Sequence, residues 1–148
     1  MKKLFIKIGG IIAIFSIVFP ACQKGNDGKS KTQLLTGMEW KLSKSEGRLN
    51  SNPFTDHYPS LPSCTQDDKY KYNTDNTYLL SEGASKCGPT DPDTIVAGTW
   101  HFTQNETKIK IDGTESTINQ LDNNIFIISG NYYHNPDTVY YRYTFVHY

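Results

Sequence analysis

The chain has 148 residues with 15 basic and 15 acidic side chains, so its formal net charge is zero, and 13% of its residues are aromatic. A chain of this length builds one domain of ordinary size. A balanced charge gives no strong field for nucleic acid. The length thus suits one domain, and the balanced charge excludes a strongly basic nucleic-acid-binding protein.

The first residues have the layout of a secretion signal. Three lysines precede an apolar stretch from Ile8 to Phe19, and the sequence then reads Pro20-Ala21-Cys22. The apolar stretch is about a dozen residues, shorter than the roughly 20 that a membrane-spanning helix needs. A small residue before a cysteine resembles the lipobox of bacterial lipoproteins, in which the cysteine is lipidated and becomes the new N-terminus. We expect a lipoprotein signal peptide over residues 1–21 and lipidation of Cys22; an ordinary signal would leave a free thiol there.

A polar segment, residues 22–33, follows the signal and is predicted to be a flexible tether. Cleavage would leave 12 basic and 15 acidic residues, a net charge of about −3. By resemblance to other lipoproteins, Gln23 after the cysteine indicates the outer membrane of Gram-negative cells. The membrane face, periplasmic or external, stays open.

The remaining domain, residues 34–148, reads as β-structure, because runs of alternating or β-branched and aromatic residues recur between polar turns. Leu34 and Leu35 are predicted to form a short helical turn that covers one end of the fold. Turns are predicted at 73–76, at Asp112-Gly113 and at 122–124. The predicted strands are 38–44, 68–72, 77–81, 99–103, 108–112, 115–121, 125–129 and 138–147.

Two longer connections, Gly47–Ser63 and Glu82–Ala97, each border one of the two remaining cysteines. With Cys22 lipidated, Cys64 and Cys87 are left as a pair in an oxidising compartment, which predicts a disulfide between them. No Cys-x-x-Cys or histidine pair lies nearby, so neither a metal nor another cofactor is expected. The neighbouring Asp67 and Asp68 are interpreted as solvated carboxylates.

About eight consecutive strands leave two exposed edges unless the sheet closes. The predicted fold is therefore all-β, an antiparallel up-and-down barrel of about eight strands. A two-sheet β-sandwich is the alternative, because strand number alone does not separate the two.

Several short motifs, in this order and spacing, resemble the lipocalin-like domains of secreted bacterial lipoproteins. The resemblance covers residues 34 to about 146 and implies a small barrel with a lumen, binding of small molecules and no catalytic residue. Its motifs are Leu35-Thr36-Gly37-Met38-Glu39-Trp40-Lys41-Leu42, Cys64 with Asp67-Asp68 and Tyr72, Asp75-Asn76-Thr77-Tyr78, Cys87, and Gly98-Thr99-Trp100.

Strand alternation directs a largely aromatic set of side chains inward. A filled core and a ligand cavity are both compatible with it, and the tyrosines favour a pocket, since a buried phenol needs a hydrogen-bond partner. The candidate ligand-binding residues of the lumen are Trp40, Tyr70, Tyr72, Tyr78, Trp100, Phe102, Tyr141 and Tyr143.

These features predict a lipid-anchored envelope protein that binds a small, partly apolar molecule in the barrel mouth. The alternative is a surface adaptor with a filled core, whose long loops bind an envelope protein or a polysaccharide. An enzyme is not expected, since the four scattered histidines form no recognisable catalytic set with serine, cysteine or carboxylates. Asp-Thr-apolar motifs leave O-glycosylation at Thr94 and Thr138 open.

Overall fold

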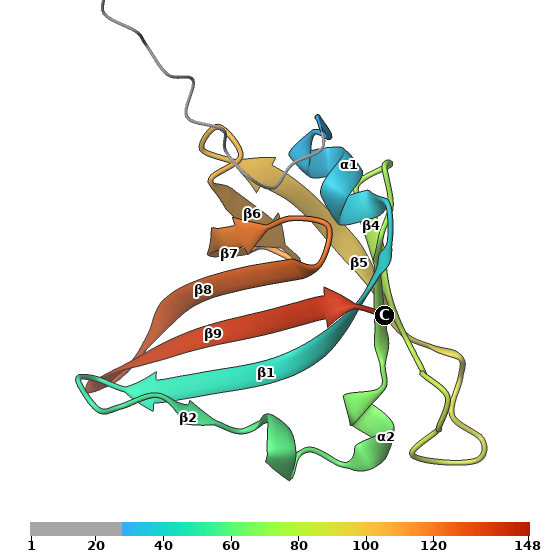
Figure 1. The fold of residues 1–148 in the computed structure, drawn as a ribbon. Helices are drawn as coiled ribbons and strands as arrows, with labels where there is room; N and C mark the ends of the chain where they lie inside the picture. Colours follow the sequence, from blue (N-terminus) through green and yellow to red (C-terminus); the bar gives the residue numbers. More distant parts are fainter. Residues whose placement is uncertain (1–27) are drawn as a thin grey trace, which may run out of the picture.

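Eight antiparallel strands close into a barrel in the computed structural model, which describes residues 28–148 (Figure 1). Each strand pairs with the next, and the last pairs back with the first, so the all-β up-and-down barrel is confirmed. A ninth strand, β2 (Thr55–Asp56), pairs with Glu46 and Gly47 on β1. The barrel strands are β1 (Glu39–Leu49), β3 (Lys69–Tyr72), β4 (Thr77–Ser81), β5 (Thr94–Thr103), β6 (Lys108–Ile111), β7 (Thr114–Leu121), β8 (Ile125–His134) and β9 (Asp137–His147).

The short helix α1 (Lys31–Thr36) closes one end of the barrel (Figure 1). It starts with a capping box, in which the Ser30 hydroxyl accepts from the Gln33 backbone N–H at 3.2 Å and the Gln33 side chain accepts from the Ser30 N–H at 2.8 Å. Leu34 and Leu35 are fully buried. The predicted helical turn is therefore confirmed, and it begins at Lys31, within the segment predicted to be tether.

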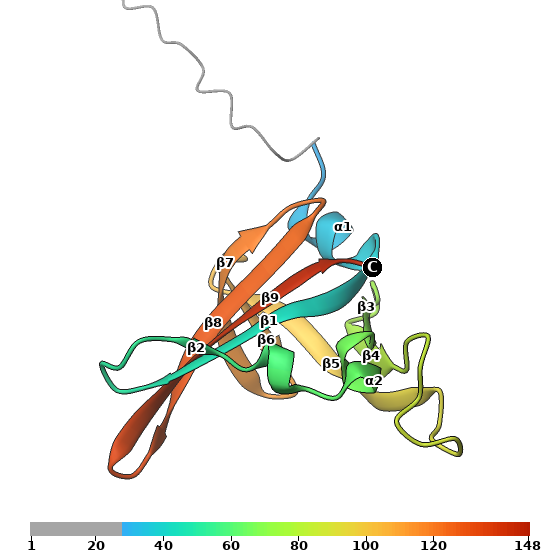
Figure 2. The same cartoon turned by 60° about the horizontal axis from the view of Figure 1, so that its bottom comes forward.

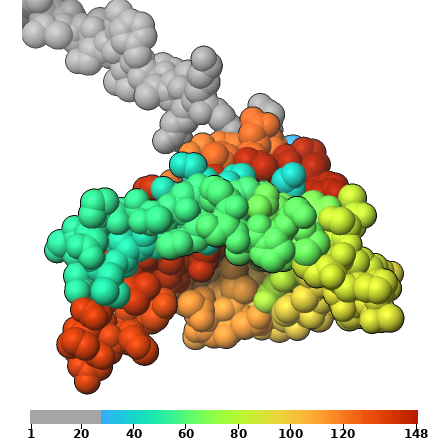
Figure 3. All heavy atoms as spheres, turned by 90° about the horizontal axis from the view of Figure 1, so that it is seen from below, coloured from blue at the N-terminus to red at the C-terminus, as the bar shows by residue number. Residues whose placement is uncertain are grey.

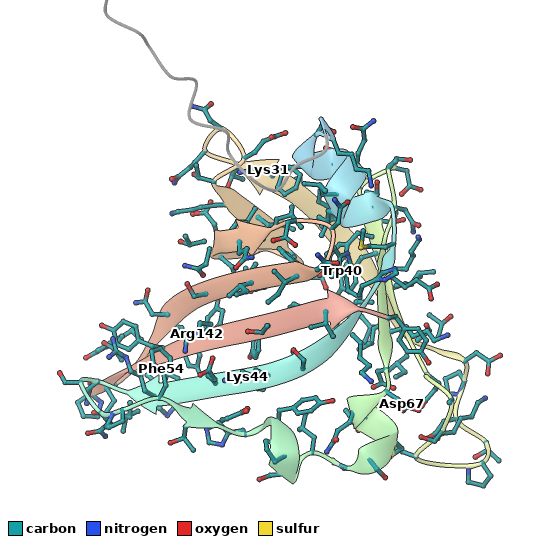
Figure 4. The ribbon with its side chains drawn as sticks, in the orientation of Figure 1. Lys31, Trp40, Lys44, Phe54, Asp67 and Arg142 are labelled. Atoms are coloured by element: carbon teal, nitrogen blue, oxygen red, sulfur yellow. A yellow bond between two sulfur atoms is a disulfide. The ribbon has the colours of Figure 1, made fainter. Side chains whose placement is uncertain are left out.

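A packed apolar core lies beneath this helix. We call this end of the barrel the closed end. The indole N–H of Trp40 donates to the Leu35 carbonyl at 2.9 Å, which ties the core to the helix (Figure 4). Aromatic rings meet with centroids 5.8 Å apart for Trp40 and Phe126, and 5.9 Å apart for Tyr72 and Trp100. The core residues are Leu34, Leu35, Trp40, Tyr72, Tyr78, Trp100, Ile109, Leu121, Phe126, Ile128 and Phe145.

Strands β1, β8 and β9 run on beyond the other strands as a projecting ribbon (Figure 2). Pairing of β8 with β9 continues from Ile125 opposite Val146 to His134 opposite Asp137. The sequence prediction ended this strand at residue 129, so it missed five residues of β8. Likewise, β5 begins at Thr94 instead of residue 99, and the second long connection is correspondingly shorter.

The first long connection folds into a strap, residues 55–66, across the gap between β1 and β3. It contains β2, the 3-10 helix η1 (Tyr58–Ser60) and the short helix α2 (Ser63–Gln66). The Gln66 side chain donates to the Leu61 carbonyl at 2.8 Å, and the Tyr58 hydroxyl donates to the Gln66 carbonyl at 3.1 Å. The disulfide Cys64–Cys87, with Cα atoms 5.2 Å apart, joins the strap to the second connection, as predicted.

Most residues of the N-terminal predictions lie outside the described residues 28–148. The signal peptide over 1–21, the lipidation site Cys22 and tether residues 22–27 belong to that part of the chain. Within residues 28–148, no helix combines the length and apolar character needed to cross a membrane.

Candidate functional site

The end of the barrel opposite α1 holds a cavity of about 640 Å³. Figure 3 looks onto this end and shows a recess between the strap, in green, and the β6–β7 hairpin, in orange. The volume falls within the range of about 300–1,000 Å³ that is usual for small-molecule sites. The cavity is lined by Leu42, Ser45, Leu61, Thr65, Tyr70, Tyr72, Tyr78, Ile111, Thr114, Ser116, Ile128, Tyr132, Tyr141, Tyr143 and Phe145.

Small inward side chains keep this end hollow. A β-bulge between Leu42 and Lys44 inserts one extra residue into β1 opposite β9. Beyond the bulge the alternation is shifted by one, so Ser45 rather than Lys44 faces the cavity. On β7, Thr114 and Ser116 occupy the inward positions. None of these three side chains is large enough to fill the space in front of it.

Tyr141 crosses the inner face of the ribbon because a glycine lies beside it. A β-carbon at Gly130, its partner on β8, would come within 2.3 Å of the Tyr141 hydroxyl oxygen. The ring therefore rests on Gly130, and its hydroxyl lies 2.9 Å from Ser116 Oγ on β7. This contact links β9 to β7 across the cavity wall.

Four other tyrosines that line the cavity differ in their hydroxyl contacts. The Tyr78 hydroxyl donates to Asp112 Oδ2 at 2.5 Å, whereas the hydroxyls of Tyr70, Tyr72 and Tyr143 make no hydrogen bond within residues 28–148. Burial raises the pKa of Tyr70 to about 12 and also raises the pKa values of Tyr72 and Tyr143. All three phenols are therefore neutral near pH 7 and can donate to a bound molecule.

Five of the eight candidate lumen residues line the cavity: Tyr70, Tyr72, Tyr78, Tyr141 and Tyr143. Trp40, Trp100 and Phe102 lie apart from it, in or against the packed core. The Trp100 indole N–H donates to the Asn73 carbonyl at 3.1 Å, and its ring meets Phe102 edge-on at 5.2 Å.

The sequence prediction missed the lining residues that have small side chains or lie at the bulge and in the strap. Thr114 and Ser116 share their alternation with Ile118, so the strand pattern of β7 contained a signal for them. Ser45 depends on the bulge, and Leu61 and Thr65 come from the strap, which has no periodicity. No pattern in the sequence marks these last three positions.

A second, shallower hollow of about 310 Å³ continues along the ribbon. Its lining includes Gly47, Leu49, His57 and Val139. Gly47 pairs with the cavity residue Tyr141, which places the two hollows next to each other on the β1–β9 ladder. The His57 ring lies over Gly47, where a β-carbon would be 3.4 Å from its Nε2.

Three carboxylates gather where the strap joins β3 (Figure 4 labels Asp67). Asp68 is only 6% exposed, so the interpretation as a solvated carboxylate is wrong for this residue. Desolvation, together with the charges of Glu82 and Asp67, raises the pKa of Asp68 to about 6. Within the described part of the chain, no three His, Cys, Asp or Glu side chains are arranged to hold a metal ion.

Neither models of known protein families nor curated proteins match the chain. The resemblance to lipocalin-like domains consequently stays a prediction. Any assignment of function depends on the cavity itself.

Proposed function

We propose that the protein is a lipid-anchored envelope protein that binds a small, partly apolar molecule in the barrel cavity. The observation that supports binding most strongly is the cavity of about 640 Å³, because a scaffold with a filled core would leave no such space. Its wall combines aliphatic side chains with several phenols. Such a wall suits a ligand with an apolar body and a few hydrogen-bonding groups.

The open side of the cavity, its mouth, would let a ligand enter and leave while the barrel stays folded. The strap borders the cavity through Leu61 and Thr65 and is fixed at one end by the disulfide. The adjoining hollow by Gly47 and His57 gives a longer ligand room to extend along the ribbon. The lipid anchor and the envelope location rest on the N-terminal sequence alone.

A neutral fluorescent probe, N-phenyl-1-naphthylamine, tests the proposal with the chain lacking residues 1–21. We expect its emission to rise on binding, and tryptophan emission to respond less, since both tryptophans lie outside the cavity. The substitution Ser45→Phe places a ring in the cavity and should weaken binding by about tenfold or more. Lys44→Phe adds the same ring to the outer face of the same strand and should leave affinity unchanged.

Circular dichroism of both variants controls for folding. Equal probe affinity in the wild type, Ser45→Phe and Lys44→Phe would mean that the probe binds elsewhere, and no binding to any of them would remove the support for a ligand-binding cavity.

A second candidate, an adaptor for another envelope protein or a polysaccharide, is favoured by the tip of the ribbon. Large apolar side chains are exposed there: Tyr133 by 68%, Tyr132 by 55% and Leu49 by 42%. Exposed aromatic residues of this kind are common at binding surfaces. Photo-crosslinking from residue 133 in intact cells should capture a specific partner on this reading, whereas crosslinking from Glu106, at the opposite end of the barrel, should not.

A further inference from the structure

The electrostatic environment of the cavity restricts the ligand beyond its size and polarity. Among the described residues, none of the fifteen that line the cavity carries a charge. Two acidic side chains contact or lie close to its tyrosines. Asp112 holds the Tyr78 hydroxyl at the β6–β7 side, and Asp68 lies beyond Tyr70 on the strap side.

Asp68 belongs to the inner face of the barrel. It immediately precedes β3, and alternation places it on the same side as Tyr70 and Tyr72, both of which line the cavity. The β3–β4 register pairs Lys69 with Ser81, so the next position along sets Asp68 opposite Glu82. The negative charge of Asp68 is close enough to Tyr70 to contribute to the rise in its pKa.

This acidic pair has unused hydrogen-bonding capacity. Asp68 Oδ1 and Glu82 Oε2 are both buried and make no hydrogen bond within residues 28–148. Asp67, the third carboxylate, is partly occupied by Ser85, whose N–H and hydroxyl each donate to Asp67 Oδ2 at 3.0 Å.

Basic residues near the site point elsewhere. Lys86 lies within electrostatic range of Glu82, but its ammonium group binds Asp93 Oδ1 at 2.5 Å and the Asp91 carbonyl at 2.8 Å. Arg48 borders the second hollow, yet its guanidinium group stacks over the rings of Phe54 and Tyr140 on the outer face. An anionic ligand group beside Tyr70 would thus lie close to the buried Asp68 carboxylate, and no residue of the cavity lining would supply a counterion.

We propose that the cavity selects neutral or cationic amphiphiles and rejects carboxylates, and that Asp68 is the residue that sets this preference. The inference rests on the proposed function and specifies its ligand class. Neutral groups such as hydroxyls or amides hydrogen-bond to Tyr70, Tyr72 and Tyr143. A protonated amine also gains the attraction of Asp68, whereas a carboxylate is repelled by it.

Displacement of N-phenyl-1-naphthylamine by three ten-carbon molecules at pH 7.5 tests this selection: decanol, decylamine and decanoate, each below its micelle concentration. We expect decanol and decylamine to displace the probe with at least about tenfold higher affinity than decanoate, the order of effect for one like charge in a poorly solvated site. Decanoate that competes as well as decanol would overturn the inference while leaving ligand binding intact.

The substitution Asp68→Asn keeps the shape of the side chain and removes its charge. It should reduce the discrimination against decanoate to about threefold or less, and leave decanol affinity within about twofold. Glu106→Gln removes one charge from the exposed β5–β6 turn at the closed end and should change neither affinity. Discrimination that persists in Asp68→Asn would show that Asp68 does not set the preference, and absence of probe binding to the wild type would instead count against the proposed function.

Discussion

The closed end and the open end of the barrel are built from the same strands but from different residues. At the closed end, Trp40, Trp100 and Phe126 fill the interior and are at most 2% exposed. At the open end, the lining mixes tyrosine, serine and threonine with a few aliphatic residues, and the space between them stays hollow. Two differences therefore separate the packed core from the cavity: the volume of the inward side chains, and the gap that opens between β1 and β3 beyond their pairing at Glu39–Lys41.

Truncation of one large aromatic residue in each half should give the largest measurable contrast. Trp40→Ala should cost about 4 kcal/mol of unfolding free energy, because it leaves a buried void and removes the hydrogen bond to Leu35. Tyr143→Ala should cost about 1 kcal/mol, since this half-buried ring already borders open space. Urea unfolding monitored by circular dichroism gives both values. Equal costs would contradict the division into packed and hollow halves.

Removal of the disulfide should act on the open end. Replacing both Cys64 and Cys87 by serine frees a loop that spans 23 residues of sequence separation and should lower stability by about 3 kcal/mol. Hydrogen exchange should rise most in the strap and stay low in β8 and β9 near Phe126. Uniformly faster exchange would instead mean that the strap and the closed end unfold as one unit.

The acidic pair predicts a smaller effect with a defined pH dependence. The pKa of Asp68 is raised to about 6 in the folded protein, above its ordinary value of 3.8, so folding favours the protonated form. The protonated Asp68 side chain contributes fully to the folding free energy below about pH 4, and this contribution is lost as the pH rises through about 6. Asp68→Asn should therefore be more stable than the wild type at pH 7.5, by on the order of 2 kcal/mol, and about equal at pH 4.

Urea unfolding of the wild type and Asp68→Asn between pH 4 and pH 7.5 measures this difference. A stability difference that is constant across that range would mean that the ionisation of Asp68 is not coupled to folding. If the wild type is more stable than Asp68→Asn at pH 7.5, the Asp68 carboxylate has a stabilising partner in the folded protein.

The regular part of the fold was predictable because its signals are local. Alternating apolar residues gave the eight barrel strands, and Asp112-Gly113 gave a hairpin turn in which both residues have positive φ, 46° and 86°. The end of β8 was not predictable in the same way. From Asn131 to His134 the strand lies on the projecting ribbon, where no core demands apolar alternation, and backbone pairing with β9 alone maintains it.

The candidate site likewise has a part that local sequence patterns predict and a part that they do not. The strand alternation correctly predicted that Tyr70, Tyr72 and Tyr143 face inward. It does not predict where along the barrel axis the packed core ends and the cavity begins. Trp40 and Trp100 have the same inward parity and lie in the closed end. This boundary depends on where α1 docks and on which neighbouring strands contribute small residues, both of which are properties of the assembled barrel.

Helix α1 also fixes the point at which the chain enters the barrel. Residues 28–30 lead into this helix at the closed end, and Lys29 donates to Asn123 on the β7–β8 turn at 2.9 Å. In the proposed lipid-anchored protein, the anchor at Cys22 would therefore be joined to the barrel at the end opposite the cavity. The attachment and the cavity mouth would then lie at opposite ends of the barrel, so the anchor would not cover the route by which a molecule enters or leaves.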